Sequence, residues 1–377
     1  MRNIPKKKKT FSLFIQSNSP GEITAWVKPI VQTAQKQNPN CHITLLLTPC
    51  QYASGKEVEV AQNISGIDQI YTPSQTIKLL FSWPWFSKQN QPGAILFLGG
   101  DLLYAKLFGL KYRLPVYAYT QNKIKKSLLI RKIFSRALDG DLMAERTKNF
   151  SENKTKIFAK HQLRDQDYCL FMCGSRPQHF FNFLPIITET VQCIKKRQPS
   201  FQAILLVSPF IHQNDFTKYQ KKHDLSDFII ISQPANSLEL ISIAKLVVTI
   251  PGTNNMEIAY LQKPAIVVFP LNHPEHILTD GLLCFLGKIP LLNLLLQKII
   301  ISIVKRKKRY FSLPNEIAKQ YIYPEIVEKI NPSKLADTIL KTYHDNAKLT
   351  LITKKLATIN LPQNPAQTIC QEIFKGQ

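Results

Sequence analysis

Short apolar stretches that alternate with helical stretches are the feature that most constrains how this chain folds. Apolar strands are expected over residues 11–16, 42–47, 94–98, 116–119, 168–172, 202–207, 228–231, 246–250 and 265–269. Strands that are apolar along their whole length are typical of parallel sheets covered by helices on both faces. The sequence therefore predicts an α/β protein built on parallel sheets.

The series of strands and helices restarts after the polar stretch 151–167, which indicates two domains. A length of 377 residues agrees with two domains at about 100–200 residues each. We expect an N-terminal Rossmann-like domain over residues 1–160 and a second over 161–350, the two facing a cleft. A helical tail is expected over 351–377.

Charge is distributed unevenly along the chain. The formal net charge is +24, and three segments without acidic residues, 1–21, 102–138 and 281–315, hold 21 of these charges. Such an excess of positive charge favours a polyanionic partner. The candidate classes are a nucleic acid, an anionic membrane and a phosphate-bearing substrate. The charges lie beside long apolar runs and not beside aromatic residues spaced for base stacking, so no nucleic acid is expected.

The segment 281–304 is apolar but is interrupted by Lys288, Pro290, Asn293 and Lys298. A membrane-spanning helix needs about 20 mostly apolar residues, and the uninterrupted pieces here are shorter. A basic run follows at once, formed by Lys305, Arg306, Lys307, Lys308 and Arg309. The combination favours an element that lies on an anionic membrane surface, with a buried core helix as the alternative.

Seven cysteines, an odd number without a CxxC pair, indicate a reducing compartment. The apolar stretch after the basic start is too short for a secretory signal. We therefore expect a cytoplasmic protein, bound peripherally to the inner face of the membrane.

The most specific motif runs from a buried strand through Pro251, Gly252 and Thr253 into a helix that carries Glu257. A helix N-terminus at this position suits a diphosphate, because its unpaired N–H groups and the helix dipole both favour negative charge. Gly252 would let a phosphate approach the backbone, Thr253 would cap the helix or donate its hydroxyl, and Glu257 would accept from a sugar diol. The alternative is an ordinary capped helix.

A second strand of the same half delivers Gly174, Ser175 and Arg176 to the same edge of the sheet. A guanidinium beside glycine backbone suits bidentate phosphate binding, although Arg176 could equally pair with a surface carboxylate. In the first half, Asp101 follows a buried strand and is a candidate general base, or else a helix cap. Glu22 follows the first strand and would either cap its helix or face the cleft.

No metal or cofactor is expected. The pairs Asp139/Asp141 and Asp165/Asp167 match D-x-D, but about 0.4 such matches arise by chance and neither pair follows a strand end. The histidines form no HExxH motif, and the chain has no G-x-S-x-G, Walker or GxGxxG sequence, which argues against hydrolases, NTPases and nicotinamide enzymes.

These motifs together resemble the lipid-A-disaccharide synthase family of GT-B glycosyltransferases. The resemblance rests on Pro251-Gly252-Thr253 with Glu257, on Gly174-Ser175-Arg176 and on Gly21-Glu22, and further on residues 310–318 and 324–327. The family's first loop continues with Ser-Gly-Asp after its Gly-Glu, which this chain lacks, and Pro251 stands where the family usually has Ser.

The resemblance implies an inverting transferase, independent of metals, that moves an acylated glucosamine from a UDP-linked donor to a lipid-borne sugar phosphate. It implies Asp101 as the catalytic base and Glu22 as a second catalytic residue. Donor-binding residues would be Gly174, Ser175, Arg176, Gly252, Thr253, Glu257 and Asn315. The basic run 305–309 would face the membrane.

Other functions remain open. One is another UDP-sugar enzyme on the same fold, either a lipid glycosyltransferase or a UDP-GlcNAc epimerase. A second is a non-catalytic basic protein that binds membrane or nucleic acid. A third is a synthase that keeps the fold and has lost activity through its altered first loop.

Overall fold

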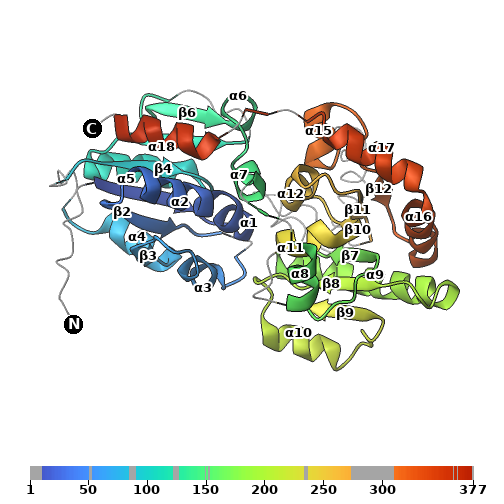
Figure 1. Cartoon of the computed structure of the whole chain (residues 1–377). Helices are drawn as coiled ribbons and strands as arrows, with labels where there is room; N and C mark the ends of the chain where they lie inside the picture. Colours follow the sequence, from blue (N-terminus) through green and yellow to red (C-terminus); the bar gives the residue numbers. More distant parts are fainter. Residues whose placement is uncertain are drawn as a thin grey trace, which may run out of the picture. The chain divides into compact units, whose positions relative to one another are not determined.

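The computed structural model describes residues 11–50, 53–84, 91–121, 127–148, 150–151, 153–232, 237–272, 310–359, 361–362 and 364–375. The chain divides into two compact units, shown in Figure 1. Unit 1 comprises Met1–Phe150 and Asn360–Gln377, and unit 2 comprises Ser151–Ile359.

Unit 1 is built on a parallel sheet with the strand order β3-β2-β1-β4-β5-β6. The strands are β1 (Phe11–Ser17), β2 (Cys41–Leu47), β3 (Gln69–Tyr71), β4 (Gly93–Phe97), β5 (Val116–Thr120) and β6 (Lys132–Ser135). The helices are α1 (Pro20–Glu22), the π-helix η1 (Ile23–Val27), α2 (Lys28–Gln37), α3 (Glu57–Gln62), α4 (Pro73–Phe81), α5 (Leu102–Tyr112), α6 (Arg136–Asp139), α7 (Leu142–Lys148) and α18 (Pro365–Lys375).

Helices cover both faces of this sheet. Phe14 of β1 stacks on Tyr112 of α5 with ring centroids 5.4 Å apart. Phe11, three residues earlier on the same strand, contacts Phe374 of α18 at 5.2 Å. Because side chains three residues apart point to opposite faces of a strand, α5 and α18 lie on opposite sides of the sheet.

Unit 2 repeats the arrangement, with the strand order β12-β11-β10-β7-β8-β9. The strands are β7 (Tyr168–Met172), β8 (Ala203–Leu206), β9 (Phe228–Ile231), β10 (Ala244–Thr249), β11 (Ala265–Pro270) and β12 (Glu325–Glu328). The helices are α8 (Lys154–Lys160), α9 (Pro177–Arg197), α10 (Gln213–Gln220), α11 (Ser237–Ile243), α12 (Asn254–Tyr260), α15 (Leu313–Ala318), α16 (Pro332–His344) and α17 (Asn346–Leu356).

In each sheet the strand that comes first in the chain lies at the centre. In unit 1 the chain moves outward from β1 to β3, returns to the other side of β1 as β4, and continues outward to β6. Unit 2 does the same from β7 to β9 and from β10 to β12. Both are the 3-2-1-4-5-6 order of the Rossmann fold, so the expected two parallel α/β sheets are confirmed. The strand order reverses between β1 and β4 and between β7 and β10, and at such points ligands bind at the carboxyl ends of the strands.

The unit boundaries differ from the expected domains at two places. Residues 151–160 were expected in the first domain, but α8 belongs to unit 2, where Lys160 and His161 contact Glu239 of α11 at 2.8 and 2.9 Å. Residues 360–377 were expected as part of a separate tail, but α18 packs into unit 1. There Lys132 pairs with Glu372 at 3.2 Å.

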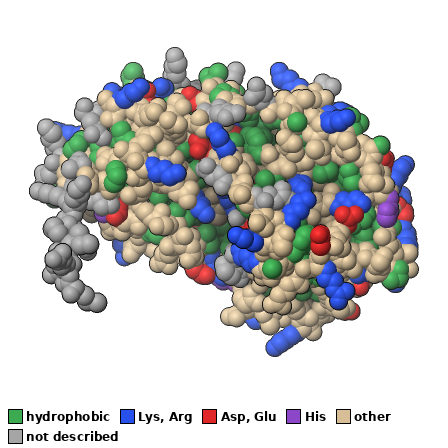
Figure 2. All heavy atoms as spheres, in the orientation of Figure 1, with side chains coloured by type: hydrophobic (Ala, Val, Ile, Leu, Met, Phe, Trp, Pro, Cys, Tyr) green, Lys and Arg blue, Asp and Glu red, His purple; other side chains and the backbone are tan. Residues whose placement is uncertain are grey.

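Two further expectations concern membrane contact. None of the helices within the described ranges is long and apolar enough to span a membrane. The apolar segment 281–304 and the basic run 305–309 lie outside the described residues, so their proposed role stays a prediction. Figure 2 shows Lys and Arg side chains spread over the visible face of both units.

Candidate functional site

The reversal point of unit 1 is organised around Gln16, the sixth residue of β1. The amide nitrogen of Gln16 donates to the backbone oxygens of Gly99 (3.0 Å) and Asp101 (2.9 Å). The backbone oxygen of Gln16 accepts from the N–H of Leu98 at 3.0 Å. One side chain of the central strand therefore fixes the turn that follows β4.

Glu22 folds back onto the loop after β1. Its Oε2 accepts from the N–H groups of Asn18 (3.4 Å) and Ser19 (3.3 Å) and from the hydroxyl of Ser17 (3.4 Å). Burial raises the pKa of Glu22 above its ordinary value, and these donors offset part of the increase. The carboxyl lies against Gly99, where an added Cβ would collide with it. Both strand-end loops that carry the predicted acids therefore meet here.

Asp101 is exposed and caps the N-terminus of α5, where its Oδ1 accepts from the N–H of Leu103 at 2.9 Å. The alternative interpretation of Asp101 as a helix cap is therefore correct for this oxygen. Among the described residues Oδ2 has no hydrogen-bond partner, so the same carboxylate retains an acceptor for a substrate hydroxyl.

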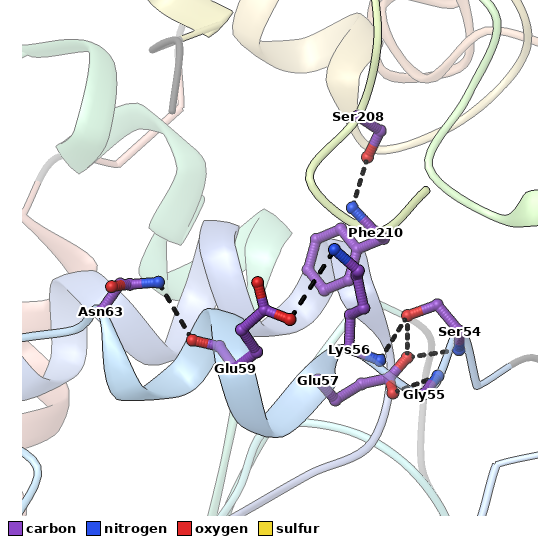
Figure 3. Close-up of polar contacts among 8 residues, drawn as sticks. All are labelled: Ser54, Gly55, Lys56, Glu57, Glu59, Asn63, Ser208 and Phe210. Atoms are coloured by element: carbon purple, nitrogen blue, oxygen red, sulfur yellow. Dashed lines mark hydrogen bonds and ion pairs between the residues drawn. The ribbon is translucent and has the colours of Figure 1, made fainter. Parts of the chain in front are cut away.

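The loop after β2 reaches the same edge of the sheet and is held by Glu57. As Figure 3 shows, the Glu57 carboxylate accepts from the N–H of Ser54 (2.6 Å), the hydroxyl of Ser54 (2.9 Å) and the N–H of Gly55 (3.0 Å). Glu57 is 7% exposed and was not predicted. It orders this loop from within, so its carboxylate is not available for a ligand.

In unit 2 the loops after β7 and β10 pack directly on each other. Gly174 has φ of +98°, and an added Cβ would lie 2.7 Å from Cδ1 of Ile250. The positive φ favours glycine here, and a larger residue would also displace the tip of Ile250. Gly252 differs, because it has no atom within 4 Å of the place where a Cβ would stand and its φ lies outside the left-handed region.

The Pro251-Gly252-Thr253 loop is held by a residue that the motif did not single out. Asn255 is fully buried, and its side chain accepts from the N–H of Gly252 (3.3 Å) and donates to the backbone oxygen of Ile250 (3.1 Å). Thr253 occupies the N-cap position of α12 but makes no capping hydrogen bond with its side chain, contrary to one of its expected roles. Glu257 lies in the first turn of α12 and is 3% exposed.

Arg176 occupies the N-cap position of α9 without capping it through its side chain. Ser175 and Arg176 are half-buried, and the 21-residue helix begins immediately after them at Pro177. The structure thus gathers Gly174, Ser175 and Arg176 with the Gly252 loop at one reversal point.

Asn315 has a structural role that the prediction of donor contact did not foresee. Its amide nitrogen donates to the oxygen of Tyr323 (2.9 Å) and to Glu325 (2.8 Å), and its oxygen accepts from the N–H groups of Ile322 and Tyr323, both at 2.8 Å. These four bonds use both donors and both lone pairs of the amide. We therefore correct the predicted role of Asn315: its side chain supports the loop before β12 and does not bind the sugar donor directly.

Three of the four aspartates of the D-x-D pairs are engaged within the protein. Asp139 accepts from the N–H of Ser135 at 2.7 Å, Asp141 pairs with Arg136 at 3.1 Å, and Asp167 pairs with Lys245 at 2.7 Å. Within the described part of the chain no group of three or more His, Cys, Asp or Glu side chains is arranged to hold a metal ion.

The loops of unit 2 fall within a stretch that matches a known family. Residues 140–308 match the model of lipid-A-disaccharide synthetase. This stretch of the chain is similar to these enzymes. The expected resemblance is therefore confirmed over this stretch, which includes Gly174-Ser175-Arg176 and Gly252-Thr253. No curated protein matches the chain.

Solved structures share the fold at low sequence identity. The UDP-GlcNAc 2-epimerase from Neisseria meningitidis bound to UDP-GlcNAc is 12% identical, with a TM-score of 0.53 over 98% of this chain and 100% of that one. A Listeria monocytogenes protein described as a UDP-N-acetylglucosamine 2-epimerase is 14% identical, with a TM-score of 0.51 over 98% of each chain. MurG from Acinetobacter baumannii is 15% identical, with a TM-score of 0.48 over 97% and 99%. The first two support the GT-B fold class.

The shifted pKa of Glu22 predicts a pH-dependent effect of Glu22→Gln. Because the pKa is higher in the folded protein than in the unfolded chain, the contribution of Glu22 to stability is complete at pH values below the ordinary pKa. It is lost as the pH rises through the raised pKa. The glutamine of the variant does not titrate, so the variant should gain stability relative to wild type as the pH rises from acidic to neutral.

Urea unfolding of both proteins at a series of pH values measures this difference. A free-energy difference that stays constant across the acidic range would show that Glu22 titrates normally.

Proposed function

We propose that this chain is a UDP-sugar-dependent glycosyltransferase that transfers an acylated glucosamine to a lipid-borne sugar phosphate. The observation that carries the proposal is the lipid-A-disaccharide synthetase match over residues 140–308, because it contains both loops at the reversal point of unit 2. A family match on a GT-B fold supports glycosyl transfer; the acyl group and the lipid acceptor belong to the proposal.

The donor diphosphate is assigned to unit 2. Gly252 offers exposed backbone with open space above it, and Asn255 holds the loop rigid from below. Arg176 lies at the start of the long helix α9, where the helix dipole adds to its charge. Ser175 and Thr253 would supply hydroxyl groups, and Glu257 would accept from the sugar or ribose.

The acceptor is assigned to unit 1, with Asp101 as the base. An oxygen of the Asp101 carboxylate would take the proton from the acceptor hydroxyl. At the same time the hydroxyl oxygen would attack the anomeric carbon of the donor sugar. The bond from this carbon to the diphosphate breaks, and UDP leaves with the electron pair. Glu22 lies beside the Gly99 turn and would hydrogen-bond the sugar. The enzyme would work at the inner membrane face, with residues 305–309 against anionic lipid.

A UDP-GlcNAc 2-epimerase is the second candidate. It is favoured by the two structures with TM-scores above 0.5, whose names describe this activity. The two functions differ in their products, because an epimerase converts the sugar nucleotide without any acceptor.

The open space above Gly252 predicts that Gly252→Ala weakens donor binding without harming the fold. The methyl group meets no protein atom, but it would occupy the space that we assign to the diphosphate. We expect wild type to bind UDP at millimolar concentration or below, and the variant to bind at least about tenfold more weakly. Isothermal titration calorimetry with UDP measures both affinities.

Gly174→Ala is the contrasting variant, since its Cβ would meet Ile250 and its φ is positive. It should lower the thermal midpoint, whereas Gly252→Ala should not. Equal UDP affinity of wild type and Gly252→Ala would remove this loop from the donor site.

The role of Asp101 predicts that Asp101→Asn loses turnover and keeps UDP binding. The amide still accepts from Leu103 N–H as a helix cap, but it cannot take a proton. The rate of UDP release in the presence of acceptor should fall by about 10²–10⁴. Turnover close to that of wild type would exclude Asp101 as the base.

A further inference from the structure

We infer that Gln16 is a positioning residue for the reaction, which holds the Asp101 carboxylate in place through the backbone of its turn. No motif in the sequence marks Gln16, and its role follows from the hydrogen bonds of the strand-end turn. The inference rests on the proposed role of Asp101.

The two hydrogen bonds of the Gln16 amide span the whole turn. Its nitrogen donates to the oxygen of Gly99 at 3.0 Å and to that of Asp101 at 2.9 Å. Both partners are carbonyl oxygens, so the nitrogen and not the oxygen of the amide must face them. Gln16 thus uses both N–H donors to fix the backbone on either side of Gly100.

Other side chains confine the glycines of the turn, and Gln16 orients its carbonyl groups. Gly100 has φ of +90°, and an added Cβ would lie 2.6 Å from Oγ1 of Thr48. Gly99 packs against the Glu22 carboxyl. The turn is therefore confined by side chains from β1, α1 and the end of β2, and its two carbonyl groups are oriented by Gln16.

Gln16 leaves one polar atom unsatisfied within the described part of the core. The residue is fully buried in the central strand, and its Oε1 has no partner among the described residues. A buried polar atom without a partner costs about 1–3 kcal/mol, and Gln16 incurs this cost while its nitrogen holds the two carbonyl groups of the turn. Departures from the local rules of folding are expected at functional sites, and this one supports the backbone of the proposed base.

The placement of a base must be accurate to well within 1 Å, because a misplacement of that size costs up to about 10²-fold in rate. Loss of the Gln16 bonds would free the Gly99–Asp101 carbonyl groups to reorient and would shift the carboxylate. The donor site lies in unit 2, so UDP binding would be unaffected.

Two substitutions of Gln16 test the inference. Gln16→Met keeps the length of the side chain and removes both donors. Gln16→Glu keeps the shape, but its ionised form faces two carbonyl oxygens without a proton to donate, while its protonated form donates one. We expect Gln16→Met to lose about 10- to 100-fold in kcat at every pH. We expect the turnover of Gln16→Glu, relative to wild type, to rise as the pH falls.

Thr48→Val is the matched control. Thr48 is 1% exposed, touches the same turn at Gly100, and its hydroxyl has no partner among the described residues. This variant disturbs the same part of the core without removing a hydrogen bond, so its kcat should stay within about twofold of wild type. Thermal midpoints of all variants and calorimetric UDP affinities identify any general damage.

Normal kcat in Gln16→Met would overturn the inference. A ratio of Gln16→Glu turnover to wild-type turnover that does not change with pH would overturn it as well. This second measurement decides the matter if Gln16→Met fails to fold. The proposed function fails separately, if wild type itself transfers no sugar.

Discussion

In each of the two parallel sheets the chain begins at a central strand, and the direction in which further strands are added reverses there. The rest of the structure depends on this reversal of strand order. Connections from neighbouring strands must leave toward opposite sides of the reversal point, so the carboxyl ends of β1 and β4, and of β7 and β10, are not crossed by a connection. The polar loops that follow these strands are therefore left uncovered and can bind a ligand. The candidate site residues of each unit follow these four strands.

The two reversal points are built differently, and the difference agrees with the two tasks assigned to them. In unit 2 the loops combine one glycine that the backbone conformation favours, Gly174, with one that it does not, Gly252. Open space above rigid backbone suits a diphosphate. In unit 1 the turn is confined by Gln16 and Glu22, and the Asp101 carboxylate at its end is exposed. A confined turn with one exposed carboxylate suits proton transfer.

The sequence could predict those parts of the fold that depend on continuous apolar strands. β7 and β9 have the expected bounds, and the other predicted strands agree within two residues. The strands β3, β6 and β12 were missed, because these short edge strands are partly exposed and carry polar or charged side chains. The return of α18 to unit 1 depends on contacts such as Phe11 with Phe374, which lie too far apart in the chain for a local pattern to reveal.

The same limit applies to the site. Motifs placed Asp101, Gly174 and Gly252 at strand ends, because glycine and charge there are visible in the sequence. They could not distinguish a residue that faces a ligand from one that holds a loop. Asn315 uses its whole amide within the protein, and Asn255 and Gln16 support the loops that the motifs identified. A buried polar residue in an apolar strand was the available signal for Gln16.

Mass spectrometry of the products is the most direct test of the central claim. The purified protein would be incubated with UDP-acylglucosamines and a lipid-linked sugar phosphate in vesicles that contain anionic lipid. The account predicts UDP release together with a lipid product heavier by one acylated glucosamine residue, both dependent on the acceptor. Conversion of the sugar nucleotide without acceptor, or no reaction with any donor, would contradict it.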